Sequence, residues 1–194
     1  MSTETTTTRI DAAIGYSIAH TDDEFDAIHR LNYQGFVEEI PQHPPNTGCR
    51  LIDRFHMENT YVIAKNATQV VGMVCLRGAR PFSLEAKLEH LDQHFPFAAQ
   101  SPCELRLLYV EPVHRRSSVF YGLAKALFAQ AIRARHDLAL VSASLREMRL
   151  YKHLGFVAFA HEVGSAEARY QPMWLDLARM TQAVPYLVAD SDER

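Results

Sequence analysis

The segment from residue 103 to residue 120 constrains this chain more strongly than any other. Its first part, through Leu105 to Val110, is a mostly apolar run that predicts a strand. Pro112 breaks this run, and Arg115 and Arg116 follow in a short basic loop. An amphipathic helix is predicted after Ser117. Its apolar stripe comprises Leu123, Ala124, Leu127, Phe128, Ala131 and Ile132.

The loop before this helix predicts an anion-binding site. Such a loop leaves backbone N–H groups unpaired at a helix N-terminus, here beside the guanidinium groups of Arg115 and Arg116. This arrangement suits a phosphate-bearing ligand, whereas the alternative is a solvated pair of surface arginines. Glu104 lies on the strand that feeds the loop. An anion site and a candidate base therefore share one short segment.

Length and composition indicate one soluble globular domain. The chain has 194 residues, of which 47% are hydrophobic and 22% charged, so a sizeable core can be buried. The net charge of -3 argues against broad nucleic-acid binding, which needs a basic excess. No apolar run reaches membrane-spanning length, and no signal-peptide pattern begins the chain. Three widely spaced cysteines, two of them in apolar runs (Cys75 and Cys103), indicate a reducing compartment, so we expect a cytoplasmic protein.

The two ends of the chain are expected to lie outside the domain. Residues 1–9 contain a run of four threonines and predict a disordered lead-in. The domain is expected to span residues 10–180, and residues 181–194 form a tail. The apolar segment 184–188 in this tail could pack on its own domain or on a second copy of the chain, which would give a homodimer.

Alternating strand and helix patterns predict an α/β fold. Strands are predicted at 16–19, 60–64, 70–76, 105–110, 138–141, 156–159 and 170–175. A first helix is predicted after Asp22 or Asp23, either of which could be its N-cap, and another is predicted after Ser117. Ser83 could cap a short helix or could simply start a turn. The last helix is predicted over 145–153, with Gly155 at its C-terminal end.

Two motifs give a specific resemblance. Val110-x-Pro112-x-x-Arg115-Arg116 and the segment from Leu150 to Phe156 (Leu-Tyr-Lys-His-Leu-Gly-Phe) resemble the GCN5-related N-acetyltransferase (GNAT) superfamily over residues 14–177. The resemblance implies a mixed central sheet with splayed middle strands, flanked by helices. Acetyl-coenzyme A or a longer acyl-coenzyme A would enter the splay, with its pyrophosphate on the Arg-Arg loop. The implied donor-binding residues are Leu108, Tyr109, Val110, Arg115, Arg116, Ser117, Ser118, Val119, Phe120, Ser144 and Tyr151, and no metal is implied.

A second resemblance narrows the first. The segments 28–39, 52–55, 61–64 and 71–77 resemble the acyl-homoserine lactone synthases and the long-chain N-acyl amino acid synthases. Those families carry a Glu-x-x-Arg strand, whereas this chain has Glu104-x-Arg106, one residue shorter. In a strand, Glu104 and Arg106 share a face, while a three-residue separation would place them on opposite faces. The match is partial, and lactone formation is not supported.

The phosphate loop departs from the superfamily pattern. Ser118 and Phe120 stand where the family usually has glycines, which let a backbone approach a pyrophosphate closely. A serine hydroxyl could donate to phosphate, and Phe120 could narrow the approach or point into the core. An acyl carrier protein is therefore an alternative donor to acyl-coenzyme A.

Acyl transfer to an amine needs a base for the amine and an acid for the departing thiolate. Glu104 is the candidate base, directly or through water, and the alternative is that it only pairs with Arg106 or a neighbouring strand. By resemblance, Tyr151 is the candidate acid, and the alternative is a packing tyrosine. The family likewise implies that a backbone N–H of Tyr109 or Val110 holds the thioester carbonyl.

Other side chains are candidates for the acceptor and acyl sites. Arg77 and Arg106 could hold an acceptor carboxylate or phosphonate, or could instead pair with Asp53, Glu58 or Glu104. Tyr33 and Phe36 could line an acyl channel, although a core stripe is the alternative. The ten histidines show no metal-ligand spacing.

Two function classes remain open at this stage. The first is an enzyme that moves an acyl group from coenzyme A or a carrier protein to a small primary amine, such as an amino acid or an aminophosphonate. The second is a thioester-binding or interaction domain that keeps the fold without turnover. Glu104, Tyr151 and the Arg-Arg loop favour the first, and Ser118 and Phe120 favour the second.

Overall fold

One mixed sheet forms the centre of the molecule. The computed structural model describes residues 13–67, 69–165 and 168–183, and the predictions for residues 1–9 and for the segment 184–188 lie outside this part of the chain. The strands are β1 (Ile14–Ile18), β2 (Thr60–Asn66), β3 (Gln69–Arg77), β4 (Pro102–Val110), β5 (Leu138–Ser144), β6 (Val157–Ala158), β7 (Val163–Gly164) and β8 (Arg169–Asp176). The helices are α1 (Asp22–Tyr33), α2 (Val119–Arg133), α3 (Met148–His153) and α4 (Leu177–Ala183).

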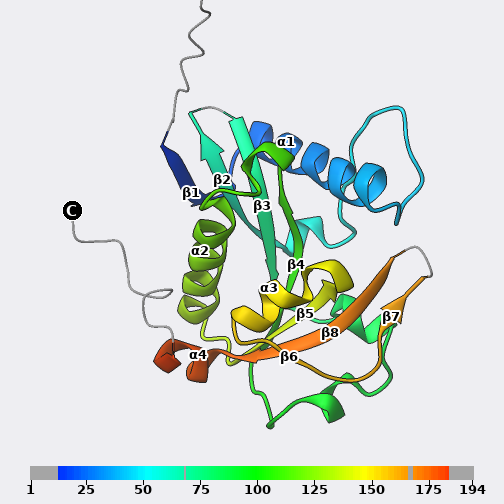
Figure 1. The fold of residues 1–194 in the computed structure, drawn as a ribbon, viewed down its shortest axis with the longest axis vertical. Helices are drawn as coiled ribbons and strands as arrows, with labels where there is room; N and C mark the ends of the chain where they lie inside the picture. Colours follow the sequence, from blue (N-terminus) through cyan, green and yellow to red (C-terminus); the bar gives the residue numbers. More distant parts are fainter. Residues whose placement is uncertain (1–12, 68, 166–167, 184–194) are drawn as a thin grey trace, which may run out of the picture.

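The strand order divides the sheet into two parts (Figure 1). β1, β2, β3 and β4 form an antiparallel run, β5 joins β4 in parallel, and β8 continues antiparallel to β5. The short strands β6 and β7 both pair with β8. A parallel connection needs a crossover, and α2 supplies it between β4 and β5. The predicted α/β class and mixed sheet are confirmed.

The two long helices cover opposite faces of the antiparallel part. Along β2, Val62 and Ala64 join the core cluster under α2, whereas Tyr61 and Ile63 join the cluster under α1. This alternation follows from the two-residue period of a strand. β2 and β3 are therefore apolar on both faces, which explains their nearly continuous hydrophobic runs.

The helix α1 begins one residue earlier than its sequence signal indicates. Thr21 is the N-cap, because its hydroxyl accepts from the Glu24 amide and the Glu24 carboxylate accepts from the Thr21 amide. The prediction of Asp22 or Asp23 as the cap was wrong, and both lie in the first turn. After α1 the chain continues as a π-helical segment, Gln34–Glu39. This segment brings Gly35 against the ring of Tyr109, where a Cβ atom would lie 2.6 Å from the ring.

A segment without long elements covers the second part of the sheet. Between β3 and β4 the chain makes two 3₁₀ turns, Ser83–Ala86 and Leu91–His94. Leu84, Leu88 and Leu91 pack there against Leu138 and Leu140 of β5. Ser83 starts a turn, the second of its two predicted alternatives, and its side chain donates to Glu104 instead of capping a helix.

The remaining sequence predictions for the fold have mixed outcomes. Gly155 ends α3 at φ +95°, as the C-terminal signal predicts. β7 has no counterpart among the predicted strands, because two residues give no periodic signal. The predicted domain boundary after residue 180 falls inside α4.

Cys75 and Cys103 are fully buried core thiols, as expected. In the described residues, no helix has both the length and the apolarity to cross a bilayer.

The buried carboxylate of Glu24 should make stability depend on acid. Hydrogen bonds from Lys65 and from the His20 and Thr21 amides outweigh burial and lower the pKa of Glu24 to about 2. A depressed pKa contributes stability that is present above the usual carboxylate pKa of about 4.5 and is lost as the pH falls towards 2. We expect Glu24→Gln to destabilise the protein at pH 7 by about 1–3 kcal/mol and to flatten this acid dependence. Urea unfolding at several pH values measures both effects, and an unchanged acid slope would contradict the assignment.

Candidate active site

A large cavity opens where β4 and β5 separate. The strands pair in parallel over four residue pairs, the last of which joins Leu105 to Val141. β4 continues to Val110 and β5 to Ser144 without further pairing between them. A cavity of about 880 Å³, called here the donor cavity, lies along this separation. The predicted splay of the middle strands is therefore confirmed.

A β-bulge directs β4 along the wall of the donor cavity. Between the pairs Arg106–Cys75 and Tyr109–Met73, β4 has two residues where β3 has one. Leu107, the first of the two, has φ +56°, in the left-handed region. A bulge bends its strand and increases the local twist, so it helps β4 turn away from β5 at this point.

The mouth of the donor cavity lies at the N-terminus of α2. Ser117 accepts from the Val119 amide through its hydroxyl, and it donates to the His114 carbonyl. The amides of Ser118, Phe120 and Tyr121 have no acceptor among the described residues. Free amides at the start of a 15-residue helix make an electropositive concavity. The anion site predicted for this loop is thus geometrically available.

The two loop arginines differ in their partners. Arg115 donates to the Val110 carbonyl and to both oxygens of Glu39, and it lies over the Tyr109 ring. Burial raises the pKa of Glu39, but the hydrogen bonds from Arg115 and Tyr109 outweigh it and lower this pKa overall. Arg116 is exposed and has no ion-pair partner among the described residues. Arg116 is therefore the freer of the two for a phosphate.

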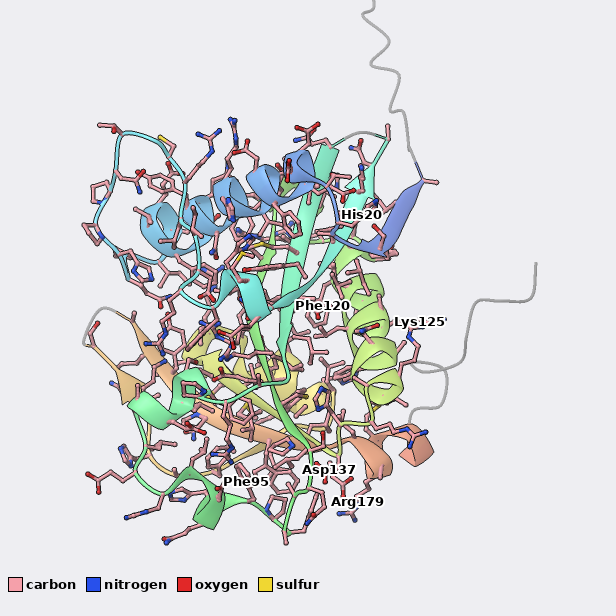
Figure 2. The ribbon with its side chains drawn as sticks, turned by 180° about the vertical axis from the view of Figure 1, so that it is seen from behind. His20, Phe95, Phe120, Lys125, Asp137 and Arg179 are labelled. Carbon is pink, nitrogen blue, oxygen red and sulfur yellow. The ribbon has the colours of Figure 1, made fainter. Side chains whose placement is uncertain are left out.

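Phe120 faces inward instead of blocking the phosphate loop. It packs against the main core cluster, lines the donor cavity and meets Tyr121 edge-on. Figure 2 shows Phe120 on the sheet side of α2, with Lys125 on the opposite side. The departure from glycine at this position therefore puts the aromatic ring in the core, the second of the two predicted alternatives. Arg116, Ser118 and Val119 do not line the donor cavity, and Val119 is buried in the core.

Tyr151 and Ser144 line the far side of the donor cavity, on α3 and at the end of β5. Burial raises the pKa of Tyr151, and nearby Glu147 raises it further, so the phenol stays protonated at neutral pH. The Tyr151 ring packs edge-on against Phe156, and its hydroxyl has no hydrogen-bond partner among the described residues. A protonated phenol without a partner at a cavity wall is able to donate a proton.

Glu104 is buried and strongly engaged. One oxygen accepts from the Ser83 amide at 2.7 Å and lies 3.4 Å from Nε of Arg106. The other accepts from the Ser83 hydroxyl at 2.6 Å and from the Leu84 amide at 3.1 Å. The contact with Arg106, expected from their shared strand face, is present. If Glu104 acts as a base, the proton has to reach it through one of these hydrogen-bond donors, or the donor has to be displaced first.

Arg106 joins Glu104 to Asp53 in a buried ionic network. Its two terminal nitrogens each donate to a different Asp53 oxygen at 2.9 Å. Asn59 and the Phe55 amide complete the shell around Asp53. Burial raises the pKa of Asp53, but Arg106 outweighs it and the pKa is lowered overall. The ion-pair alternative for Arg106 is the one observed, although the side chain also lines both cavities.

Arg77 pairs with Glu58 and lies outside both cavities. Its side chain is 0% exposed, lines neither cavity and donates to Glu58 and to the Pro81 carbonyl. The guanidinium stacks 3.7 Å from the centre of the Phe55 ring. The ion-pair alternative predicted for Arg77 is therefore the one observed, because β3 directs this side chain under the loop 55–58.

A second cavity adjoins the first. This acceptor cavity, of about 480 Å³, lies between the loop 51–54, the turn at Ser83 and β4. Phe36 lines both cavities at their junction, as a channel residue would, whereas Tyr33 lines neither and hydrogen bonds to Asn46. The residues shared by the two cavities are Phe36, Leu105, Arg106, Leu107, Ser142 and Tyr170.

Several residues at the site carry no recognisable sequence signal. Ser142 and Tyr170 each have a buried hydroxyl without a partner among the described residues, at the junction of the cavities. Glu39 meets Arg115 across 76 residues of chain, and Ser83 meets Glu104 across 21. Ser142 is the exception, because it and Ser144 stand near the position where the GNAT resemblance implies a polar contact with the pantetheine arm of the donor.

Comparison with known proteins identifies the class to which this fold belongs. Residues 31–125 match the family described as the acetyltransferase (GNAT) domain. Comparison with curated protein sequences gives no significant match. The acyl-homoserine lactone synthase LasI has a similar structure, with a TM-score of 0.73, 16% identity, and coverage of 94% of this chain and 100% of LasI.

Two further solved structures extend the comparison. The coenzyme A-dependent acyl-homoserine lactone synthase BjaI, with SAM and isopentyl-CoA, gives a TM-score of 0.68 at 17% identity, over 84% of this chain and 82% of BjaI. FeeM, an N-acyl amino acid synthase from uncultured soil microbes, gives 0.64 at 13% identity, over 87% of this chain and 93% of FeeM. Residues 31–125 therefore match the GNAT domain, and the chain as a whole shares its fold with these solved structures, as the two motifs predict.

The buried pair of Asp53 and Arg106 should be costly to break. Removing one partner of a buried ion pair leaves an uncompensated charge and costs about 3–5 kcal/mol. We therefore expect Asp53→Asn to lower the free energy of unfolding by about this amount in urea titrations. Asp26→Asn, which breaks surface pairs with Arg30 and Arg50, is the matched control and should cost far less. Equal losses in both variants would contradict the buried network.

Proposed function

We propose that this protein transfers an acyl group from an acyl thioester to the primary amine of a small molecule. The observation that carries the proposal is the donor cavity itself. It begins at free helix amides suited to phosphate and reaches a protonated Tyr151 hydroxyl that has no partner among the described residues. Its junction with a second cavity provides a place where donor and acceptor would meet.

The donor would enter from the N-terminus of α2. Its phosphate groups would rest on the amides of Ser118, Phe120 and Tyr121, with Arg116 beside them. The thioester arm would run between β4 and β5 past Ser144, and the backbone N–H of Tyr109 or Val110 would hold the thioester carbonyl. Acyl-coenzyme A and acyl carrier protein both fit this chemistry. The apolar lining, which includes Val74, Leu127, Phe128, Val141 and Phe156, favours an acyl chain longer than acetyl.

The chemistry would be a direct transfer. The amine nitrogen attacks the thioester carbonyl, the C–S bond breaks, and Tyr151 gives its proton to the departing thiolate. The amine proton would pass to the Ser83 hydroxyl, which lines the acceptor cavity, while the Ser83 proton moves to Glu104 over 2.6 Å. This route lets the engaged carboxylate of Glu104 act as base without losing its other donors.

The solved relatives support a small acceptor with an amine. FeeM is named an N-acyl amino acid synthase, and BjaI and LasI are named acyl-homoserine lactone synthases. The altered Glu-x-Arg spacing favours the simple amide product over a lactone. The competing candidate is a thioester-binding domain without turnover, and the pairing of Arg115 with Glu39 is the observation in its favour.

The role of Tyr151 can be tested by turnover. With hexanoyl-coenzyme A as donor and an amino acid mixture as acceptor, we expect Tyr151→Phe to reduce thiol release by about 10²- to 10⁴-fold. Donor binding should persist, because the lost hydroxyl acts on the leaving group. The rise in melting temperature with hexanoyl-coenzyme A measures that binding. A variant with full rate would remove Tyr151 as the acid, and donor binding without turnover in the wild type would favour the binding-domain candidate.

The Ser83–Glu104 route can be tested by pH–rate profiles. A general base works only when it is deprotonated, so this route predicts an acidic limb in the pH–rate profile of the wild type. We expect Glu104→Gln to remove this acidic limb and Ser83→Ala to lower the rate while keeping the limb. If the limb persists in Glu104→Gln, another group takes the amine proton.

A further inference from the structure

The acceptor cavity carries two cations that the fold itself leaves unbalanced. Arg54 and Lys87 both line this cavity and are exposed at its rim, and neither lines the donor cavity. Neither side chain has an ion-pair partner among the described residues. In contrast, the other arginine of the cavity, Arg106, is fully occupied by Asp53 and Glu104.

Each of the two cations is held in place by an aromatic ring. The Arg54 guanidinium lies 4.4 Å from the centre of the Phe55 ring, and the Lys87 ammonium lies 5.3 Å from that of Tyr170. Such cation–π contacts orient a cation without neutralising it. Both cations line the same cavity, so an anion bound there would balance their charge.

The inner end of the same cavity has the opposite character. Asp53 and Glu104 supply two carboxylates there with only Arg106 between them. At the junction with the donor cavity, the buried hydroxyls of Ser142 and Tyr170 lack partners within the described part of the chain. Tyr170 is 9% exposed, and Lys87 lies over its ring. An unpaired buried hydroxyl costs free energy, so these groups point to a polar ligand at the junction.

We propose that Arg54 and Lys87 bind an anionic group of the acceptor, so that the acceptor is an acidic amine. The proposal rests on the acyl-transfer function proposed above. The amine would lie at the inner end, near Ser83 and the carboxylates, and a carboxylate, phosphate or phosphonate would lie at the rim. Arg54 and Lys87 would then be specificity-determining residues that take no part in the chemical steps.

Matched pairs of amines test the proposal. The probes are L-leucine against L-leucinamide, and 2-aminoethylphosphonate against ethanolamine, with hexanoyl-coenzyme A as donor. We expect kcat/KM to favour at least one acidic probe over its neutral partner by about 10- to 100-fold, as expected for a lost charged contact of 1.4–2.8 kcal/mol. In the double variant Arg54→Gln/Lys87→Gln the preference should fall to about 3-fold or less, because the acidic probe loses its contact with both cations.

The control variant carries the same change of charge elsewhere. Arg133→Gln/Arg179→Gln removes two exposed positive charges from α2 and α4, outside both cavities, and should keep the wild-type preference. Equal kcat/KM for the acidic and neutral members of both pairs in the wild type would overturn the proposal. Loss of preference in the control variant as well would also overturn it, because the effect would then be one of net charge.

A binding measurement separates this inference from the proposed function. If no amine is acylated, the transfer function fails, and the melting temperature with each probe still tests the site. A rise with 2-aminoethylphosphonate or L-leucine, absent with ethanolamine and L-leucinamide and absent in Arg54→Gln/Lys87→Gln, would support the anion site alone. No difference between acidic and neutral probes in that measurement would overturn it.

Discussion

The end of parallel pairing between β4 and β5 is the constraint on which the rest of the site depends. Four pairs hold the strands together at one end, and the bulge at Leu107 turns β4 away beyond Leu105. Beyond the last pair the facing backbone groups lose their strand partners, which costs free energy in a buried site unless water or a ligand pairs with them. Here α2 and the segment 82–95 pack on opposite faces of the sheet, and the donor cavity lies along the separation of β4 and β5. Acyl transfer is the chemistry that such a gap between strands, with a helix N-terminus at its mouth, supports best.

Buried charge organises the acceptor side. Asp53, Arg106 and Glu104 form a chain of contacts from the loop after α1 to the turn at Ser83. A buried ion pair contributes little net stability, but its geometry is specific, so it places two loops relative to β4. Because these charges satisfy one another, the unbalanced cations of the cavity are those at its rim, Arg54 and Lys87. The acceptor cavity therefore has carboxylates at its inner end and unpaired positive charges at its rim.

Much of this arrangement was predictable from local patterns. The strand, basic loop and helix of residues 103–128, the hairpin of β2 and β3, and the glycine that ends α3 all follow from periodicity and from residues with strong conformational preferences. The π-helical segment after α1, the bulge in β4 and the two-residue strand β7 did not, since each depends on packing against distant chain. The N-cap of α1 is an intermediate case: Thr21 and Glu24 form a capping box that is legible in the sequence beside two competing aspartates.

The sequence by itself determined the fold class, the resemblance to the GNAT domain, and the strand, basic loop and helix of residues 103–128, because these rest on contiguous residues. Only the tertiary structure decided what each charged side chain does. Arg77, Arg106 and Arg115 all looked available for ligands, yet each has an acidic partner that lies far away along the chain: Glu58, Asp53 and Glu39. Arg54, Lys87 and Arg116 have none among the described residues. Whether an arginine binds a ligand depends on which carboxylate the fold brings within hydrogen-bond distance, and no local pattern carries that information.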